Sequence, residues 1–476
     1  MPHATHDTTR SPRLQADSQT DDWSREVLPR LPKRFEEQAK ALKAFKRSRQ
    51  IGSASDLLRG LLAYVYTVHS FQHLSLWSVL IGLADVSATD WRKRLQRAAA
   101  WGQWLLQEVL ASASTVAPWV ARAGVGRILL IDGTHLKCPG PQGLVWRVHT
   151  AFDLLAGRLT HLKVTDTHEA EHLEVFELRQ GDVVITDRAN GYRERIAYVQ
   201  QQEAHLVVRF SPATLPLEEE EGRVIEVVRW LKGRHAPSGR VVSRLVWISH
   251  QGRRIALRLV AVRLSAGQRE AAQRKKKRTA SKQQRQMQAD TLYLAGWVLL
   301  VTTLPGEQWS AQQVAALYQA RWHIELLFKR LKQLLQQQRL RCTTAATALP
   351  TLLFLLLGWA LLEEESSAVR LAMRDAMHCT QQVAIGESVA PEVGESVWWQ
   401  DEGAGPLSEW VLAEISVDLL CQQIRGQYTA ARFRACLPRL QRFLCSGHRK
   451  RPHLYTQVCR WLGIPATDGD SGAVRA

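Results

Sequence analysis

Two aspartates follow short apolar runs that have the composition of buried strands. Asp132 comes directly after Ile-Leu-Leu-Ile, and Asp187 comes directly after Val-Val-Ile-Thr. A buried strand that ends in a carboxylate places it at the edge of a sheet, where sites form. Paired carboxylates there suit Mg²⁺, and two such ions about 4 Å apart activate a water and stabilise the leaving oxygen of a phosphodiester. Each aspartate taken alone could equally be structural.

Four polar side chains share one stripe of a helix predicted further along the chain. They are separated by 3, 4 and 7 residues, steps that return to the same helix face, and they are Tyr318, Arg321, Glu325 and Lys332. Apolar side chains lie close to this stripe, so the pattern indicates a glutamate in a cleft, flanked by two cations and a phenol. The alternative is an ordinary ion pair between Arg321 and Glu325 on a solvated face.

The chain is strongly basic. Its 476 residues include 63 Lys and Arg against 45 Asp and Glu, which gives a net charge of +18. Such a charge favours a polyanionic partner, most often nucleic acid. The densest basic segment is a predicted loop between residues 263 and 285, whose contacts to phosphates would add affinity rather than sequence choice; its centre is Arg274, Lys275, Lys276, Lys277 and Arg278. A solvated, flexible loop without a partner is the alternative.

The elements that must position these residues indicate an α/β protein. Apolar positions recur at helical spacing from residue 26 to about 123, and one part is typical of a helix-turn-helix reader of DNA. Strands and helices then alternate, and residues 224–264 have the pattern of antiparallel strands. A long amphipathic helix that carries Glu325 begins near a Ser310 cap.

We therefore predict six segments. They are a disordered tail (1–25), a helical DNA-binding region (26–123), the first part of an α/β core (124–210), a β-rich insertion with the basic loop (211–290), the second part of the core with the Glu325 helix (291–345) and a helical, basic C-terminal region (346–476). The most apolar run, residues 352–362, is too short to span a bilayer. The seven cysteines form no CxxC pair, so we expect a cytoplasmic protein with no membrane partner.

The spacing Tyr-x2-Arg-x3-Glu-x6-Lys resembles the signature of the insertion-sequence-four family of bacterial DDE transposases, and the resemblance covers about residues 50 to 365. It implies an RNase H-like catalytic core interrupted by the β-rich insertion, with helical regions at both ends. It also makes Asp132, Asp187 and Glu325 the catalytic triad that binds Mg²⁺, for which Mn²⁺ can substitute.

The resemblance assigns roles to neighbouring side chains as well. Tyr318, Arg321 and Lys332 would contact phosphates of the element's end. Trp297, in the strand before the Glu325 helix, would stack on a flipped base. One departure concerns the turn after the second aspartate, where the family often has Asp-Arg-Gly-Tyr and this chain has Asp-Arg-Ala-Asn-Gly-Tyr over residues 187–192.

The function implied by the resemblance is DNA transposition. Such an enzyme binds the terminal inverted repeats of its element, cleaves double-stranded DNA at the ends and joins them to target DNA by two-metal hydrolysis and transesterification. Some relatives pass through a hairpin intermediate. The active assembly would be a homodimer on two DNA ends, in the cytoplasm and associated with the nucleoid.

Three other functions are compatible with parts of the sequence. A catalytically silent repressor derived from a transposase would bind DNA without cutting it, and a structure-selective nuclease would cut without joining strands. The segment His168-Glu169-Ala170-Glu171-His172 matches the HExxH pattern of zinc metallopeptidases. That motif is short and arises by chance, so a polar surface helix is the ordinary explanation.

Overall fold

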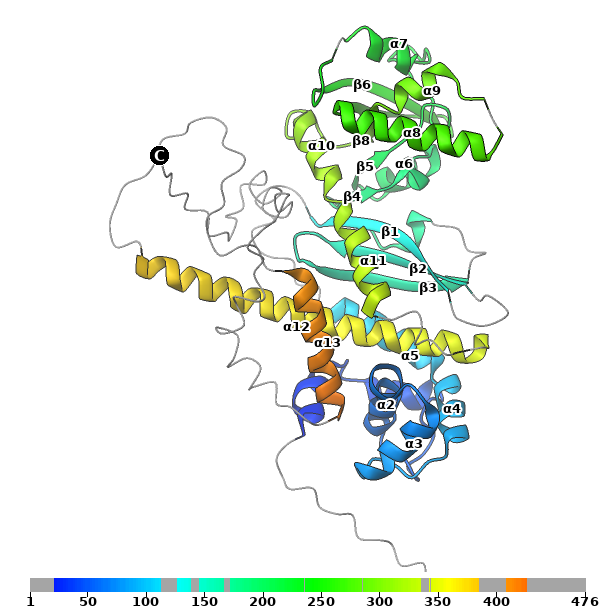
Figure 1. The fold of residues 1–476 in the computed structure, drawn as a ribbon, viewed down its shortest axis with the longest axis vertical. Helices are drawn as coiled ribbons and strands as arrows, with labels where there is room; N and C mark the ends of the chain where they lie inside the picture. The colour runs from blue at the N-terminus through cyan, green and yellow to red at the C-terminus, as the bar shows by residue number, and fades with distance from the viewer. Residues whose placement is uncertain are drawn as a thin grey trace, which may run out of the picture.

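The computed structural model describes residues 21–112, 126–137, 145–166, 172–234, 236–284, 286–334, 342, 344–384 and 408–425. Its centre is a mixed sheet of eight strands in the order β3-β2-β1-β4-β5-β8-β7-β6 (Figure 1). The strands are β1 (Ile128–Lys137), β2 (Val145–Asp153), β3 (Arg158–Asp166), β4 (Val183–Thr186), β5 (His205–Arg209), β6 (Val241–His250), β7 (Arg253–Arg263) and β8 (Trp297–Thr302).

Parallel pairing is confined to the middle of this sheet. β4 lies parallel to both β1 and β5, whereas every other pair of neighbours is antiparallel. The hairpin of β2 and β3 turns at Gly157, whose φ of +66° is a conformation that glycine adopts without strain. The sequence predicted this hairpin and its turn.

The strands predicted between residues 224 and 264 extend the same sheet, because β6 and β7 pair onto it through β8. Two expectations in this part of the chain are wrong. The valine-rich segment after residue 224 contains a short helix, α7 (Val227–Lys232), since Val227 and Leu231 fall on one buried helix face. The basic segment is a helix rather than a loop, α8 (Ala266–Lys282), because Ser265 and Gln268 form a capping box ahead of good helix formers.

The N-terminal part of the described chain is helical, as predicted. Its elements are η1 (Trp23–Val27), η2 (Leu28–Arg30), α1 (Phe35–Ala41), α2 (Ala54–Ala63), η3 (Tyr64–Val68), α3 (Phe71–Leu80), α4 (Ala88–Arg97) and α5 (Ala99–Ser112). The prediction that a disordered tail extends to residue 25 is wrong at its end, because helix η1 begins at Trp23. Trp23 is buried, and its indole N–H donates to the Ser55 hydroxyl at 2.9 Å, so the chain is anchored there. Residues 1–20 lie outside the described part.

The remaining helices connect the strands and cover the sheet. They are η5 (Leu173–Val175), η6 (Arg188–Asn190), α6 (Arg193–Gln201), α9 (Ala289–Leu294), α10 (Ala311–Gln319), α11 (Trp322–Leu334), α12 (Ala345–Ala384) and α13 (Glu409–Arg425). α10 and α11 cross one face of the sheet, and α12 passes below its β3 edge, between the sheet and the N-terminal helices (Figure 1). The part of the predicted basic C-terminal region that follows Arg425 lies outside the described residues.

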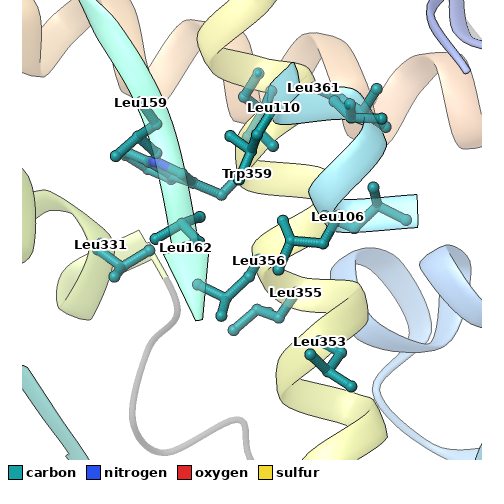
Figure 2. Close-up of a cluster of buried hydrophobic side chains, with 14 of the residues drawn as sticks. Leu106, Leu110, Leu159, Leu162, Leu331, Leu353, Leu355, Leu356, Trp359 and Leu361 are labelled. Atoms are coloured by element: carbon teal, nitrogen blue, oxygen red, sulfur yellow. The ribbon is translucent and has the colours of Figure 1, made fainter. Parts of the chain in front are cut away.

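Alternation along the strands separates two cores on opposite faces of the sheet. Ile128 and Leu130 belong to one core, with α5, α11 and α12, whereas Leu129 and Ile131 belong to the other, with α6. The close-up shows leucines from α5, β3, α11 and α12 meeting around Trp359 (Figure 2). Each leucine buried there contributes about 1.5–3 kcal/mol, so the apolar run at residues 352–362 is held in the protein core.

One helix of the described chain is long and apolar enough to cross a membrane by length and composition, over Ala345–Glu363. In this structure 83% of that stretch is buried. Burial of this extent is typical of the central helix of a folded protein core.

Candidate active site

The register of the parallel strands brings the two predicted aspartates together. Ile131 of β1 lies opposite Thr186 of β4, so Asp132 and Asp187 come next on adjacent strands, which are about 4.8 Å apart in a sheet. Asp187 follows the end of β4, as predicted. Asp132 does not end β1, which continues to Lys137 because it remains paired with β2.

Both aspartates belong to the sheet face that α11 covers. Asp132 alternates in step with Leu130, and Asp187 alternates in step with Ile185. Leu130 and Ile185 share a core with Ile324 and Leu327 of α11. The helix that carries Glu325 therefore packs on the same side of the sheet as the two strand acids.

A tight turn fixes the position of Asp187. Its carboxylate accepts a hydrogen bond from the Ala189 N–H at 2.7 Å, and the buried Asn190 amide donates to the Thr186 hydroxyl at 2.8 Å. The turn then passes close to β5, where a Cβ on Gly191 would come within 2.6 Å of a backbone carbonyl oxygen. Any larger residue at this position would push the turn, and Asp187 with it, away from the sheet.

The long helix predicted from Ser310 is broken in two at the site. Ser310 caps α10 as expected, through a capping box with Gln313, but the helix stops at Gln319 and α11 begins at Trp322. Between them the backbone N–H groups of Ala320 and Arg321 bond to carbonyls three residues back, as in a 3₁₀ turn. Arg321 therefore lies at the corner between two helices, not within one stripe.

From this corner Arg321 reaches two of the three acids. One guanidinium nitrogen, Nη1, lies 3.4 Å from Oδ2 of Asp132, and the other, Nη2, donates to Oε1 of Glu325. The Arg321 side chain is 19% exposed, so both ion pairs are partly withdrawn from water. Burial lowers the pKa of Arg321, but Tyr318, Glu325 and Asp132 together raise that pKa above its ordinary value.

Tyr318 lies beneath the guanidinium. The centre of its ring is 5.9 Å from the Arg321 guanidinium carbon, a cation–π distance. Burial raises the pKa of the Tyr318 phenol, and Asp187 raises it further, whereas Arg321 and Arg209 lower it. The structure thus brings together four of the predicted residues, Asp132, Asp187, Arg321 and Glu325, around Tyr318.

The donor set suits a divalent cation, because carboxylate oxygens are hard ligands of the kind that Mg²⁺ and Mn²⁺ take. Within the described residues, however, no three His, Cys, Asp or Glu side chains are close enough together to hold an ion. The guanidinium of Arg321 contacts Asp132 and Glu325 instead. The chemistry of the three acids fits a metal, and a cation of the protein already contacts two of them.

Two residues at the site, Arg209 and Trp322, escaped the sequence analysis. Arg209 ends β5, and the pairing of Thr186 with Val208 places it in one row with Asp132 and Asp187 across three strands. Trp322 follows Arg321 and is 49% exposed. Tyr192, which belongs to the turn that the family resemblance compares, follows Gly191 and is 43% exposed. An exposed tryptophan beside a charged helical stripe was the one signal that could have been noticed.

Trp297 does not have the position expected of a base-stacking residue. It begins β8 as predicted, but it is only 2% exposed and packs in the core on the far face from α11. The Arg263 guanidinium lies 4.8 Å from its ring centre, across the pair of β7 and β8. The ring is therefore already covered by the protein.

The remaining predicted DNA contacts are spread over two helices. Lys332 lies in the last turn of α11, two turns beyond Glu325 and about 10 Å along the axis. The five central cations of the basic segment are all exposed on α8, beside the β6–β8 half of the sheet (Figure 1); they are Arg274, Lys275, Lys276, Lys277 and Arg278. The structure does not bring them into the group around Arg321.

The HExxH segment lies largely outside the described residues, which resume at His172. That histidine accepts a hydrogen bond from Arg195, which also forms an ion pair with Glu174 at 2.5 Å. The hydrogen bond uses Nδ1 of His172. The one described residue of the motif thus serves a polar surface network.

Comparisons with known proteins place this site in a family. A family model for the transposase DDE domain matches residues 123–361, half of the chain. InsL, the transposase assigned to insertion sequence element IS186A of Escherichia coli (strain K12), is 34% identical over 332 residues, which cover 67% of this chain and 87% of that protein. The transposase for insertion sequence element IS421 of Escherichia coli is also 34% identical, over 333 residues with the same coverage.

The fold and these matches define an enzyme that acts on DNA. The chain belongs to the transposase DDE domain family, whose members use divalent metal ions, and its relatives are transposases of bacterial insertion sequences. DNA is accordingly the partner that its basic surface indicated. The zinc metallopeptidase alternative is thereby set aside.

Proposed function

We propose that this chain is the transposase of an insertion sequence and cuts DNA at the ends of that element with Asp132, Asp187 and Glu325. The observation that carries the proposal is the strand register that sets Asp132 beside Asp187 on the face covered by the Glu325 helix. The order β3-β2-β1-β4-β5, with β1 parallel to β4, supports an RNase H-like core, and β6 and β7 support an insertion that extends its sheet.

In this proposal the three carboxylates hold the divalent metal, Mg²⁺ or in its place Mn²⁺. A metal bound there would activate the attacking water or 3′-hydroxyl and stabilise the leaving oxygen of the phosphodiester. The turn that hydrogen-bonds Asp187 keeps that acid oriented. The core packing of Ile324 and Leu327 keeps the Glu325 helix against the sheet.

The cations around the acids orient the DNA. Arg321 offers a planar fork of donors that matches a phosphate, and Arg209, in the same row of the sheet, adds a second positive charge. Tyr318 supports the Arg321 guanidinium from below. Lys332 would contact a phosphate farther along the duplex, at the distance that two helical turns impose.

We also propose that α4 reads the terminal repeats. Ser87 caps this helix, and Trp91 and Leu95 are fully buried, which fixes its rotation. The opposite face exposes Arg92, Lys93 and Arg97, and none of these forms a salt bridge with another described residue. A capped helix with one buried face and one basic face is suited to the major groove.

The cations of α8 would add contacts to the DNA backbone, which give affinity without sequence choice. Assembly as a homodimer on two ends, a location in the cytoplasm at the nucleoid, and release through a hairpin come from the family resemblance. The hairpin has less support than the other two proposals because Trp297 is covered by Arg263. Strand transfer by a freed 3′-hydroxyl is the step that separates this enzyme from a nuclease.

The test uses the full chain and a labelled duplex that spans the boundary of its own element. We expect cleavage at the boundary with Mg²⁺, its loss in EDTA, and a decrease of more than about a hundredfold in Glu325→Gln, since even outer-shell partners of metal ligands are worth 10–100-fold. Binding in a gel shift should persist. Glu307→Gln is the matched control, because Glu307 is exposed and lies outside the site.

The other outcomes are equally specific. Binding without cleavage in any metal would identify a silent DNA-binding protein. Cleavage without joining to a target duplex would identify a nuclease. Cleavage that survives in Glu325→Gln would contradict the proposed triad.

A further inference from the structure

The Arg321 guanidinium contacts acids that a metal ion would also bind, and it is itself a group that a DNA phosphate would bind. Its guanidinium contacts Asp132 through Nη1 at 3.4 Å and Glu325 through Nη2. These two contacts come from different elements, β1 and α11, which are brought together only in the folded chain. The guanidinium is thus a positive charge between two of the three acids proposed to hold the metal.

The corner between α10 and α11 holds Arg321 in this place. The Arg321 N–H bonds to the Tyr318 carbonyl at 3.1 Å, and the Tyr318 ring lies 5.9 Å below the guanidinium carbon. The Glu325 side chain is 35% exposed and the Asp132 side chain 16%, so one end of the bridge opens to solvent. A ligand that approaches from the solvent side meets the guanidinium at this end.

Arg321 contacts Oδ2 of Asp132 and Oε1 of Glu325, and a guanidinium repels a divalent ion placed beside it. Metal binding at the acids and the contacts of Arg321 with Asp132 and Glu325 therefore oppose each other. A DNA phosphate offers the guanidinium a bidentate partner of its own. Because the phosphate can displace the acids from Arg321, DNA and metal would each favour the binding of the other.

We propose that Arg321 gates the metal site: its guanidinium neutralises Asp132 and Glu325 until a DNA phosphate takes it, so that metal binding and DNA binding are positively coupled. The inference rests on the proposed function, since it takes the acids as metal ligands. It adds that the enzyme holds metal weakly until it is on DNA. Linkage requires the coupling to be reciprocal, and coupling of this kind amounts to about 5- to 150-fold in affinity.

The experiment measures Mn²⁺ binding by the EPR signal of the free ion, with the full-length protein. Each protein is titrated alone and with a saturating duplex that ends at the element boundary, which requires no hydrolysis. We expect the wild-type chain to bind Mn²⁺ at least about fivefold more tightly with the duplex than without it. Arg321→Gln should bind Mn²⁺ more tightly than wild type without DNA and show no further gain when the duplex is added.

Lys329→Gln is the matched control. Lys329 is an exposed cation one turn beyond Glu325 on the same helix, and it lies 5.9 Å from the ring of Trp410 rather than against the acids. Lys329→Gln removes one positive charge near the site, as Arg321→Gln does, but leaves the contacts of Arg321 with Asp132 and Glu325 in place. We expect its Mn²⁺ affinities to remain within about twofold of wild type, both with and without DNA.

Two results would overturn the gate. One is a DNA-free Arg321→Gln protein that binds Mn²⁺ no more tightly than wild type while its thermal unfolding is unchanged. The other is an equal gain in Lys329→Gln, which would indicate a diffuse effect of charge. Glu325→Gln distinguishes failure of the gate from failure of the proposed function. If Mn²⁺ binding in the presence of DNA does not depend on Glu325, the proposed metal site itself is wrong.

Discussion

Charge at the site is balanced by arginines. Three acids, Asp132, Asp187 and Glu325, converge on one face of the sheet in the described structure, and Arg321 and Arg209 lie among them. Without such cations the negative charges of the carboxylates would repel one another. An enzyme that must accept both a metal and a polyanion gains from cations that can exchange partners.

His161, on the sheet face opposite α11, makes the folded protein less stable at acid pH. Burial, with smaller contributions from His149 and Lys163, lowers the pKa of His161 to about 4, and its ring packs edge-on against Phe176 at 5.0 Å. The unfolded chain protonates this group near pH 6.5. Stability is therefore fully present above pH 6.5 and is lost as the pH falls toward 4, by up to about 3 kcal/mol.

Urea unfolding at pH 7.5, 6, 5 and 4.5 checks this expectation. His161→Leu should remove part of the pH dependence between 6.5 and 4, because the apolar side chain has no proton to bind. His73→Leu, which changes an exposed histidine of the N-terminal helices, is the matched control. An identical slope in wild type and His161→Leu would show that other groups cause the acid sensitivity.

At the residue scale, the sequence was most informative where a side chain follows from local pattern. Asp187 ends its strand as the apolar run predicts, whereas Arg209 could not be found, because its place beside Asp187 depends on the register of three strands. Trp297 was placed correctly in a strand and wrongly at a surface. Which face of a strand is covered depends on helices that are distant in sequence.

Helices and strands were predicted correctly where the hydrophobic pattern is long and regular. They were missed where contacts with distant parts of the chain determine the local structure. The hairpin of β2 and β3 was recovered with its glycine turn. The break between α10 and α11 has no Gly or Pro to announce it, yet it is what turns Arg321 toward Asp132. The capping box at Ser265 was present in the sequence and would have predicted α8.

The packing of α4 depends on one glycine of α2. A Cβ on Gly60 would come within 2.3 Å of the ring of Trp91, which is fully buried between the two helices. Gly60→Ala should therefore destabilise the protein by about 1–3 kcal/mol, the usual cost of overpacking. It should also weaken binding to the element's ends, because α4 carries the basic face proposed to read them.

Denaturant unfolding together with gel shifts checks this prediction. Gly267→Ala is the matched control, since a Cβ on this glycine of α8 would meet no atom within 4 Å and alanine is favoured in helices by about 1 kcal/mol. Its stability should be unchanged or slightly higher. Gly60→Ala with wild-type stability would show that α4 has room to shift.

At the scale of the whole molecule, the N-terminal helices and the sheet face that carries the three acids are not separate bodies. Residues of α2, α5, β1, α11 and α12 share one continuous core in the described structure, and α12 lies between the sheet and the N-terminal helices (Figure 1). The order of the sheet strands and this shared core are long-range properties, so sequence pattern alone could not supply them. Their consequence is that the basic face of α4, which we propose to contact DNA, is held in fixed geometry relative to the acids.

The basic faces of α4 and α8 should then contribute differently to DNA binding. Among the described elements, α4 and α8 both present several exposed cations. Replacing four cations of α8 by glutamine should weaken binding to any duplex and reduce the salt dependence of log K by about 0.9 for each phosphate that the protein no longer neutralises; the changes are Arg274→Gln, Lys275→Gln, Lys277→Gln and Arg278→Gln.

The α4 variant provides the contrast. Arg92→Ala with Lys93→Ala should reduce binding to the element's end more than binding to an unrelated duplex, because contacts to base edges, unlike those to phosphates, depend on sequence. Fluorescence anisotropy at about 50 to 200 mM salt, with both duplexes and both variants, measures affinity and slope together. If the α8 variant keeps the wild-type salt dependence, the cations of α8 do not contact phosphates. If the α4 variant loses affinity equally for both duplexes, α4 contacts only the DNA backbone. The terminal repeats would then be read by another part of the protein.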